Sequence, residues 1–470
     1  MGVRRSSVAI CAAALLGLSE VAWTFRVQHS FSDATRLTRT PSLRRPSLPE
    51  QQSTGPAASE NAECTSRRGY AEEAARAAVG IAALSPLLPS FPSNAAKSWQ
   101  GGLNAPSAAG SRVNKDADSL LRYGLPIQDK DVTALQVELE AVKGDIPVKR
   151  FDSAVNHLNK ARVLIRDKEA SLLKAIRPKS EDKAKELLAS IGASVDPLIE
   201  AIREPASRGS PQEAAKLDKC LELQGGIADK MTALMALMVP ENYKVPVPQE
   251  FASLPQLQGR AKVEMVVKKA DGSKFDLEGR LYDEAKLVMV VDGWNAPVTA
   301  GNFVDLVSKG FYDSMKISRS DGFVVQTGKP DSGPEGYVPT GAKEPRRVPL
   351  EIFVKGDNAP MYGETTEEDG RGFAATTLPF QAYGALGMAR SEFDNNSGSS
   401  QFFWLLFDSD LTPAGKNFMD GRYACFGYTV SGADFLRDIR VGDTIVSARV
   451  VEGIDKLQKT GKSESPSYAV

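Results

Sequence analysis

The run Ser397-Gly-Ser-Ser-Gln-Phe-Phe-Trp404 decides the fold of the C-terminal part of this 470-residue chain. It leads into Phe402–Leu406, one of several short runs of alternating or β-branched residues that follow Gly259. Turns with Gly or Pro separate the runs, and one helical segment interrupts them near Thr299–Lys309. Many short strands with few helices predict a closed antiparallel β-barrel. The other runs are Lys262–Val267, Lys286–Val291, Val324–Gln326 and Thr444–Val451.

The stretch before the barrel follows a different period. From Asp131 onward, apolar residues recur every three or four positions, which places each set on one face of a helix. Four such sets predict a bundle of four antiparallel helices over residues 115–240, and hence a multidomain α + β chain. The sets begin at Leu135, Phe151, Ala184 and Leu217.

The predicted ends of the helices agree with this reading. Ser210-Pro-Gln-Glu213 offers an N-cap serine, proline at the first helical position and glutamate three residues after the cap. Ser180 before two acidic residues is a second helix start. Four prolines from Pro240 to Pro255 predict a stiff linker over residues 241–258. The barrel domain would then span 259–458, with a flexible tail at 459–470.

Three targeting signals occupy residues 1–96. Met1-Gly-Val-Arg-Arg5 and the apolar run Val8–Gly17 are typical of a secretory signal, and Phe25 to Gly55 is rich in Arg, Ser and Pro, as in transit peptides. Arg67–Arg68 then precedes a mildly apolar stretch that ends near Ala96, the pattern of a twin-arginine export signal. A chance arginine pair is the alternative. In this order the signals resemble the presequence of an alga with a secondary plastid, with a flexible lead-in at 97–114 and delivery to the thylakoid lumen of the chloroplast.

Composition excludes several classes of function. Lys and Arg number 58 against 59 Asp and Glu, so net charge favours neither nucleic acid nor an anionic membrane as a partner. Four widely separated cysteines and two histidines, one of them His157 in a helical stretch, predict no metal site and no cofactor. No segment after Ala96 reaches the length needed to span a membrane, so we expect no transmembrane anchor in the mature form. Partners should be proteins.

Four ordered motifs identify the barrel more narrowly. They are Asn295-Ala-Pro-Val-Thr-Ala-Gly-Asn-Phe303, Asp321-Gly-Phe-Val-Val-Gln-Thr-Gly328, Gly384-Ala-Leu-Gly-Met-Ala-Arg390 with the 397–404 run, and Asp420-Gly-Arg-Tyr-Ala-Cys-Phe-Gly427. Together they resemble the cyclophilin family of peptidyl-prolyl cis-trans isomerases. A helical domain followed by a divergent cyclophilin domain is similar to the large two-domain cyclophilins of the thylakoid lumen. That resemblance implies proline-containing clients, among them lumenal segments of photosystem II subunits, and a role in photosystem II assembly or repair.

The resemblance also implies site residues. Cyclophilins turn an X-Pro bond across a barrier of about 18–20 kcal/mol with an apolar slot and hydrogen-bond donors rather than a nucleophile. The catalytic candidates are Arg319, Phe323 and Gln326. The substrate-binding candidates, which line the slot or hold the peptide, are Val324, Ala389, Gln401, Phe403, Phe418, Met419 and Tyr423. The alternative is that the apolar members only fill the barrel.

The arginine departs from the family pattern, which reads Arg, four residues, then Phe. Here Arg319 precedes Phe323 by four positions, and Ser318 occupies the matching place. Either the turn at 320–322 is shortened and Arg319 still reaches the pocket, or the donor is absent. Absence would cost ~10²–10³ in rate.

Two functions therefore remain open. One is an active isomerase or folding chaperone, and the other is a catalytically weak scaffold or regulator, for example of a thylakoid phosphatase. The helical domain could contact the cyclophilin domain and cover its pocket. Residues 329–384 are expected to form a solvated, charged loop, or else a contact surface for the bundle or for a client.

Overall fold

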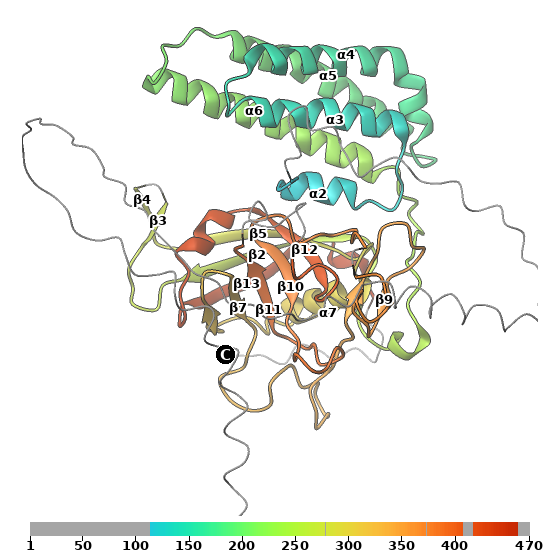
Figure 1. Cartoon of the computed structure of the whole chain (residues 1–470), viewed down its shortest axis with the longest axis vertical. Helices are drawn as coiled ribbons and strands as arrows, with labels where there is room; N and C mark the ends of the chain where they lie inside the picture. Colours follow the sequence, from blue (N-terminus) through green and yellow to red (C-terminus); the bar gives the residue numbers. More distant parts are fainter. Residues whose placement is uncertain (1–112, 278, 373, 408–416, 459–470) are drawn as a thin grey trace, which may run out of the picture. The chain divides into compact units, whose positions relative to one another are not determined.

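The computed structural model describes residues 113–458, apart from 278, 373 and 408–416 (Figure 1). All of the described residues belong to one compact unit. The predicted targeting signals at 1–96, nearly all of the lead-in and the tail at 459–470 lie outside the described residues.

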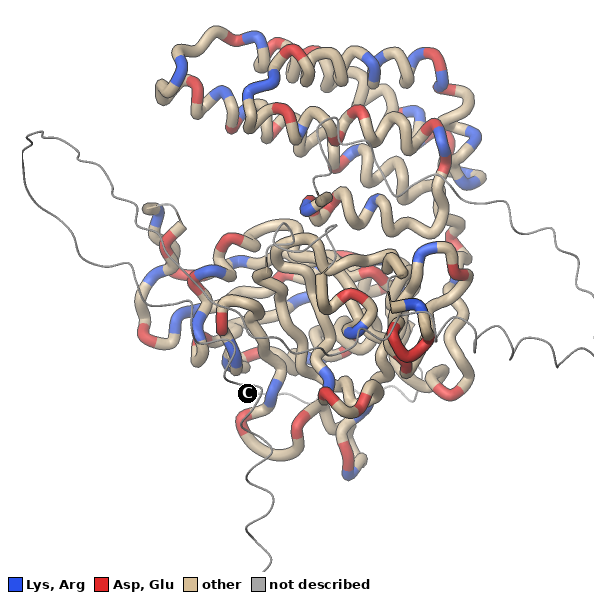
Figure 2. Tube along the Cα trace, viewed as in Figure 1, with Lys and Arg blue, Asp and Glu red and all other residues tan. Residues whose placement is uncertain are grey.

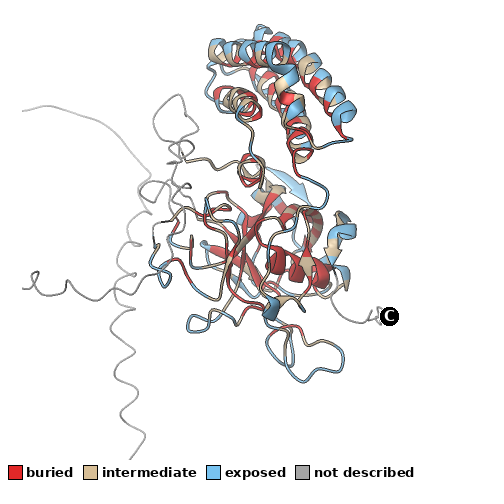
Figure 3. Ribbon diagram, turned by 90° about the vertical axis from the view of Figure 1, so that its right-hand side faces the viewer, coloured by how far each residue is buried: buried red, intermediate tan, exposed pale blue. Residues whose placement is uncertain are grey.

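Five helices precede the barrel among the described residues. Four of them are long and form the predicted bundle around one apolar core. The four-helix prediction is approximate, because a fifth, short helix also lies in this part of the chain. Figure 3 shows the buried side of each long helix facing its neighbours and the exposed side facing outward. The helices are α2 (Ala117–Tyr123), α3 (Lys130–Asp145), α4 (Phe151–Lys174), α5 (Glu181–Arg203) and α6 (Pro211–Ala236).

The start of α6 follows the predicted capping pattern. Pro211 is the first helical residue, and the Ser210 hydroxyl accepts a hydrogen bond of 3.1 Å from the Glu213 amide. The Glu213 carboxylate in turn accepts from the Gly209 amide at 2.7 Å. The cap at α5 differs, because the Ser180 hydroxyl bonds no helical amide and instead accepts from the Arg177 side chain. Of the two predicted serine caps, only Ser210 therefore bonds a helical amide through its hydroxyl.

An eight-stranded, fully antiparallel sheet forms the second domain, in the order β13-β2-β5-β12-β10-β11-β7-β6. One long helix, α7 (Pro297–Ser308), lies in the connection between β5 and β6. The strands are β2 (Arg260–Lys268), β5 (Ala285–Asp292), β6 (Arg319–Ser320), β7 (Val324–Thr327), β10 (Ala385–Met388), β11 (Phe402–Leu405), β12 (Cys425–Ser431) and β13 (Thr444–Glu452).

Short elements complete the domain. Paired short strands are β1 (Gln256–Leu257) with β14 (Leu457–Gln458), β3 (Phe275–Leu277) with β4 (Arg280–Tyr282), and β8 (Glu351–Ile352) with β9 (Met361–Tyr362). The 3-10 turns are η2 (Gln249–Phe251), η5 (Ala433–Arg437) and η6 (Ile454–Lys456).

The two edges of the large sheet meet just before β6. Lys316 forms a bridge to Thr444 at the start of β13, and the Ile445 amide donates to the Met315 carbonyl at 2.8 Å. The sheet therefore curls into a barrel that is joined at this seam by a short bridge rather than by a long strand pair. Charged residues of both signs alternate over its loops and over the bundle helices, as Figure 2 shows.

Part of the stretch 329–384 is buried in the barrel, in contrast to the predicted solvated loop. Its residues Leu350, Ile352 and Val354 are buried in the core of the barrel. The buried Glu351 carboxylate accepts hydrogen bonds from the Thr299 amide at 2.8 Å and the Val298 amide at 3.1 Å. It thereby caps α7, whose own N-cap residue Ala296 has no side chain able to do so. The loop reading was wrong for this part because an acid in an irregular stretch gives no sign of a distant partner.

The short helix α2 contacts both domains. Its buried Arg122 donates to Glu140 of α3 at 2.9 Å and to Thr232 of α6 at 2.8 Å. On the barrel side, Asn295 donates to the Gly124 carbonyl at 2.7 Å, and Leu120 and Leu121 pack into an apolar cluster on the outer face of the sheet. The domains thus touch through α2.

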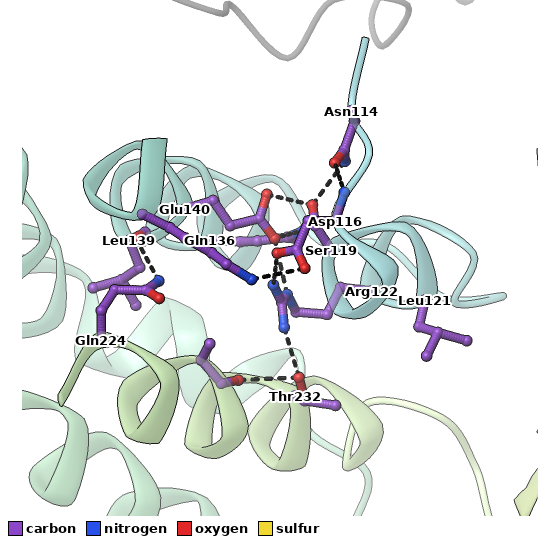
Figure 4. Close-up of polar contacts among 12 residues, drawn as sticks. Asn114, Asp116, Ser119, Leu121, Arg122, Gln136, Leu139, Glu140, Gln224 and Thr232 are labelled. Atoms are coloured by element: carbon purple, nitrogen blue, oxygen red, sulfur yellow. Dashed lines mark hydrogen bonds and ion pairs between the residues drawn. The ribbon is translucent and has the colours of Figure 1, made fainter. Parts of the chain in front are cut away.

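Figure 4 shows the polar side of this contact. The Glu140 carboxylate lies at the centre, and the Ser119 hydroxyl and the Gln136 amide donate to it at 2.7 and 2.8 Å, beside Arg122. A buried guanidinium needs such partners, because an unpaired charge away from water is strongly unfavourable. The cluster therefore fixes α2 on the bundle.

Candidate functional site

Three of the predicted site residues lie in one row across neighbouring strands. Arg319 of β6 is the cross-strand partner of Gln326 in β7, and Gln326 is the partner of Phe403 in β11. Cross-strand partners project from the same face of a sheet. The residues on either side of Phe403, Phe402 and Trp404, are buried in the barrel core, so this row faces outward.

The register bears directly on the displaced arginine. Arg319 lies seven positions before its partner Gln326, so the turn between them is one residue shorter than in the family pattern. Ser318, at the family position of the arginine, donates both its amide and its hydroxyl to the Gln326 carbonyl, at 2.9 and 3.1 Å. The structure therefore places Arg319, in spite of its shifted number, on the face that carries Gln326 and Phe403.

The guanidinium of Arg319 is engaged elsewhere in this conformation. Its Nε donates to the Asp321 carboxylate at 2.6 Å, and its side chain is 56% exposed. Asp321 also holds the turn, since its carboxylate accepts hydrogen bonds from the amides of Phe323 and Val324, each at 3.0 Å. Partial burial opposes ionisation of Asp321, but these amides and Arg319 outweigh it and lower the pKa of the carboxyl.

The inner part of the candidate slot is closed. Phe403 is only 3% exposed, because Phe380 stacks on it at 5.9 Å between ring centroids and Tyr423 meets it edge-on at 5.7 Å. The ring tip also lies over Gly387, where any Cβ atom would come within 2.1 Å of it. A side chain at position 387 would displace the ring.

We call the apolar group around Phe403 the outer cluster. It contains Val324 and is flanked by Met419, Tyr423 and Ala389. It also contains residues that the sequence reasoning missed, because their partners come from distant segments. Its buried members are Leu120, Leu121, Val324, Leu378, Phe380, Ala382, Ala385, Phe403, Leu405 and Tyr428.

The polar candidates lie beside the row. The Gln326 amide donates to the Gln401 side chain at 3.1 Å, and the Ala389 amide donates to the Gln401 carbonyl at 3.0 Å. The two glutamines therefore hold each other, and the Ala389 amide is already engaged within the sheet.

Two candidates lie at the outer rim instead. Phe323 and Phe418 are each 52% exposed, and neither is in ring contact with Phe403 among the described residues. Phe407 joins them, as it stacks on Phe323 at 6.1 Å and meets Phe418 edge-on at 5.9 Å. The sequence reasoning missed Phe407. Its position directly after the strand-like run Phe402–Leu406 was the signal that could have identified it.

The part of the chain described here shows neither a membrane-spanning helix nor a group of three potential metal ligands of the His, Cys, Asp or Glu type.

Comparison with known proteins agrees with the two-domain reading. Residues 278–462 match the model of the cyclophilin type peptidyl-prolyl cis-trans isomerase family. Residues 116–232 match the model of the PsbQ-like domain of CYP38-like peptidyl-prolyl cis-trans isomerases.

Relatives match both domains together. The chain is 39% identical to the chloroplastic peptidyl-prolyl cis-trans isomerase CYP38 of Arabidopsis thaliana, over 76% of this chain and 77% of that one. It is also 39% identical to a putative thylakoid lumen peptidyl-prolyl cis-trans isomerase of Synechocystis, over 76% of this chain and 89% of that one. Identity to chloroplastic CYP37 of Arabidopsis thaliana is 30%, over 74% and 72%. This chain therefore belongs to the CYP38-like cyclophilins, a PsbQ-like helical domain joined to a cyclophilin-type peptidyl-prolyl isomerase domain.

Proposed function

We propose that this protein binds proline-containing segments of client proteins on the outer face of β6, β7, β10 and β11 and isomerises their X-Pro bonds slowly. The observation that carries the proposal is the shared outward row of Arg319, Gln326 and Phe403. It brings a cation, an amide and an aromatic ring from three strands to one face.

Each member has a role in the proposed chemistry. Phe403, Val324 and Met419 would hold the proline ring, with Tyr423 at the wall. Gln326, supported by Gln401, would bind the peptide chain together with the backbone of Ala389. In the twisted state amide resonance is lost and the proline nitrogen becomes a hydrogen-bond acceptor, so a donor that meets it there lowers the barrier. Arg319 would be that donor.

Two contacts oppose turnover in the whole chain. Arg319 must leave Asp321, and Phe380 must move off Phe403. The second movement disturbs the outer cluster, to which α2 contributes Leu120 and Leu121. These contacts favour a resting state of low activity.

The Arg319–Asp321 contact, which withholds the donor without blocking the slot, favours a second candidate, a scaffold or regulator that binds proline segments without turnover, for example on a thylakoid phosphatase. It differs from the first in one measurable respect: it binds proline peptides but leaves their rate of isomerisation at the uncatalysed value.

We also propose thylakoid-lumen delivery and lumenal photosystem II segments as clients. The order of the three targeting signals supports the first proposal, as do the names of the chloroplast and lumen relatives. We further propose domain boundaries at 115–240 and 259–458. We also propose that the protein comes from an alga with a secondary plastid. Import of a fluorescent fusion of residues 1–96 into isolated plastids, with lysine replacing Arg67 and Arg68 as the control, tests the delivery.

Isomerisation of a short proline peptide, followed by NMR exchange at equilibrium, tests catalysis on a chain that starts at Lys97. Arg319→Ala should lower the catalysed rate ~10²-fold, the cost of one preorganised donor. Arg449→Ala is the matched control. Arg449 lies on β13, is about as exposed as Arg319 and likewise pairs with an aspartate, Asp313.

Equal activity of Arg319→Ala and the parent would remove Arg319 from the mechanism. Binding of the peptide without any catalysed exchange in the parent would establish the scaffold. Absence of both binding and exchange would refute the proline-directed function altogether.

A further inference from the structure

Phe323, Phe407 and Phe418 form a continuous row of aromatic rings at the rim of the site, which we call the rim row. Successive ring centroids are 6.1 and 5.9 Å apart. Phe323 and Phe418 are half-exposed, whereas Phe403 inside the slot is almost completely buried. In the resting conformation the rim row is thus the aromatic surface of this site that a peptide can reach first.

The backbone holds the outer rings of the rim row in place. The Phe323 amide donates to Asp321, and the Phe323 carbonyl accepts from the Leu406 amide at 2.8 Å. On the other side of the row, the buried Asn417 side chain accepts from the Met419 amide at 3.0 Å, which fixes the turn that presents Phe418. Rigid, exposed aromatic side chains lose little entropy on binding and are frequent hot spots of recognition.

The spacing of the rings points to the form of the ligand. An extended peptide rises about 3.3 Å per residue, so side chains on one face recur about every 6.6 Å. The 6.1 and 5.9 Å steps of the rim row are close to this repeat. A client strand that leaves the slot along the row therefore places every second side chain beyond the proline on a ring.

We propose that the rim row selects extended client segments that carry a large apolar side chain two residues before or two residues after the proline held at Phe403, with Phe407 as the specificity-determining residue. This inference rests on the proposed function. Phe407 is the central ring, since it alone contacts both of the others among the described residues, and it also packs against the outer cluster that contains Phe403. It therefore links the rim to the slot.

The occupant should be apolar rather than charged. The rings carry no charge, and the ion pair that adjoins Phe323 in the chain, Arg319 with Asp321, is already internally neutralised. Polar side chains in the client would lose hydration on the rings without gaining a partner.

Fluorescence anisotropy with three labelled peptides tests the inference on the chain that starts at Lys97. The first peptide is Ala-Leu-Ala-Pro-Ala-Leu-Ala, the second has serine in place of both leucines, and the third has alanine in place of proline. We expect the leucine peptide to bind about tenfold more tightly than the serine peptide, since 1.4 kcal/mol from the leucine buried on the row, whichever side of the proline it lies on, gives that factor. In Phe407→Ala the preference should fall to within about twofold.

Leu281→Ala is the control, because Leu281 is also an exposed apolar residue but lies on the separate β3–β4 sheet. It should keep the full preference. Phe407→Leu, which retains most of the apolar volume, replaces Phe407→Ala if the latter does not fold, and should show a reduced preference.

Retention of the full leucine preference in Phe407→Ala, or in Phe407→Leu where it takes its place, would overturn the inference. Equal binding of the proline and alanine peptides by the parent would instead refute the proposed function. Discrimination of proline from alanine without any leucine preference would overturn the rim row alone.

Discussion

Arg122→Met tests whether the polar cluster of Figure 4 holds α2 on the bundle. Methionine retains the apolar stem of the side chain and removes the guanidinium, which is 1% exposed and bonds Glu140 and Thr232. The substitution leaves the Glu140 carboxylate without its cation but leaves the Thr232 hydroxyl bonded to the Ala228 carbonyl.

The magnitude follows from what remains around Glu140. Removing one partner of a fully buried ion pair costs ~3–5 kcal/mol because the other charge is stranded. Glu140 keeps hydrogen bonds from Ser119 and Gln136, and its side chain is 18% exposed, so water can partly replace Arg122. We therefore expect a loss of about 2 kcal/mol in the free energy of unfolding of the helical domain.

Urea unfolding followed by circular dichroism at 222 nm measures the loss, because most of the helix lies in α3–α6. Arg166→Met is the matched control on the same bundle, since Arg166 pairs with Asp167 while both side chains are largely exposed, and it should leave the midpoint unchanged. A double-mutant cycle with Glu140→Gln should give a coupling above ~1 kcal/mol. A loss below ~0.5 kcal/mol for Arg122→Met, or additive single variants, would refute the reasoning.

Three further predictions follow from other contacts. Gly387→Ala should cost ~1–3 kcal/mol in the free energy of unfolding, because its Cβ would lie 2.1 Å from the Phe403 ring. Gly226→Ala, with open space on α6, should be neutral or stabilising. Thermal unfolding measures both, and equal effects would contradict the clash. Ser210→Ala should cost ~1 kcal/mol and Ser180→Ala less, since only Ser210 caps a helical amide; a larger loss from Ser180→Ala in urea titrations would count against the cap. Burial holds the pKa of Glu351 above its usual value although the Thr299 and Val298 amides and Tyr362 favour the charged form. The native state thus retains the proton longer than the unfolded chain, so the stability from protonated Glu351 is fully present below about pH 4.3 and is lost as pH rises through the folded-state pKa. The urea midpoint of Glu351→Gln should therefore rise relative to the parent between pH 4.5 and 7.5, and a falling difference would show the opposite sign.

The long periodic segments were predictable from sequence because local patterns determine them. The α6 start at Pro211 is where the Ser210 cap predicts it, and α7 spans Pro297–Ser308 against a prediction of Thr299–Lys309. The short helix α2 was missed, since seven residues are too few for a period to stand out and its stability comes from packing on both domains.

Sequence reasoning about the site reached its strands but not its closure. The motifs located Gln326 and Phe403, and the structure aligns Arg319 with them through a turn whose length the sequence left open. Phe380 and Leu120 could not be assigned to this site, because they reach Phe403 and its cluster from segments with no motif of their own. Such contacts depend on tertiary packing rather than on local pattern.

Because α2 is bonded to the bundle through Arg122 and packed on the barrel through Leu120 and Leu121, the two domains share one short element. Whatever stabilises α2 on one domain must, by thermodynamic linkage, alter the free energy of the other. A peptide that tightens or loosens the outer cluster would therefore be felt at the far side of the helix, as a change in the rate at which amide hydrogens of α3 and α6 exchange with solvent.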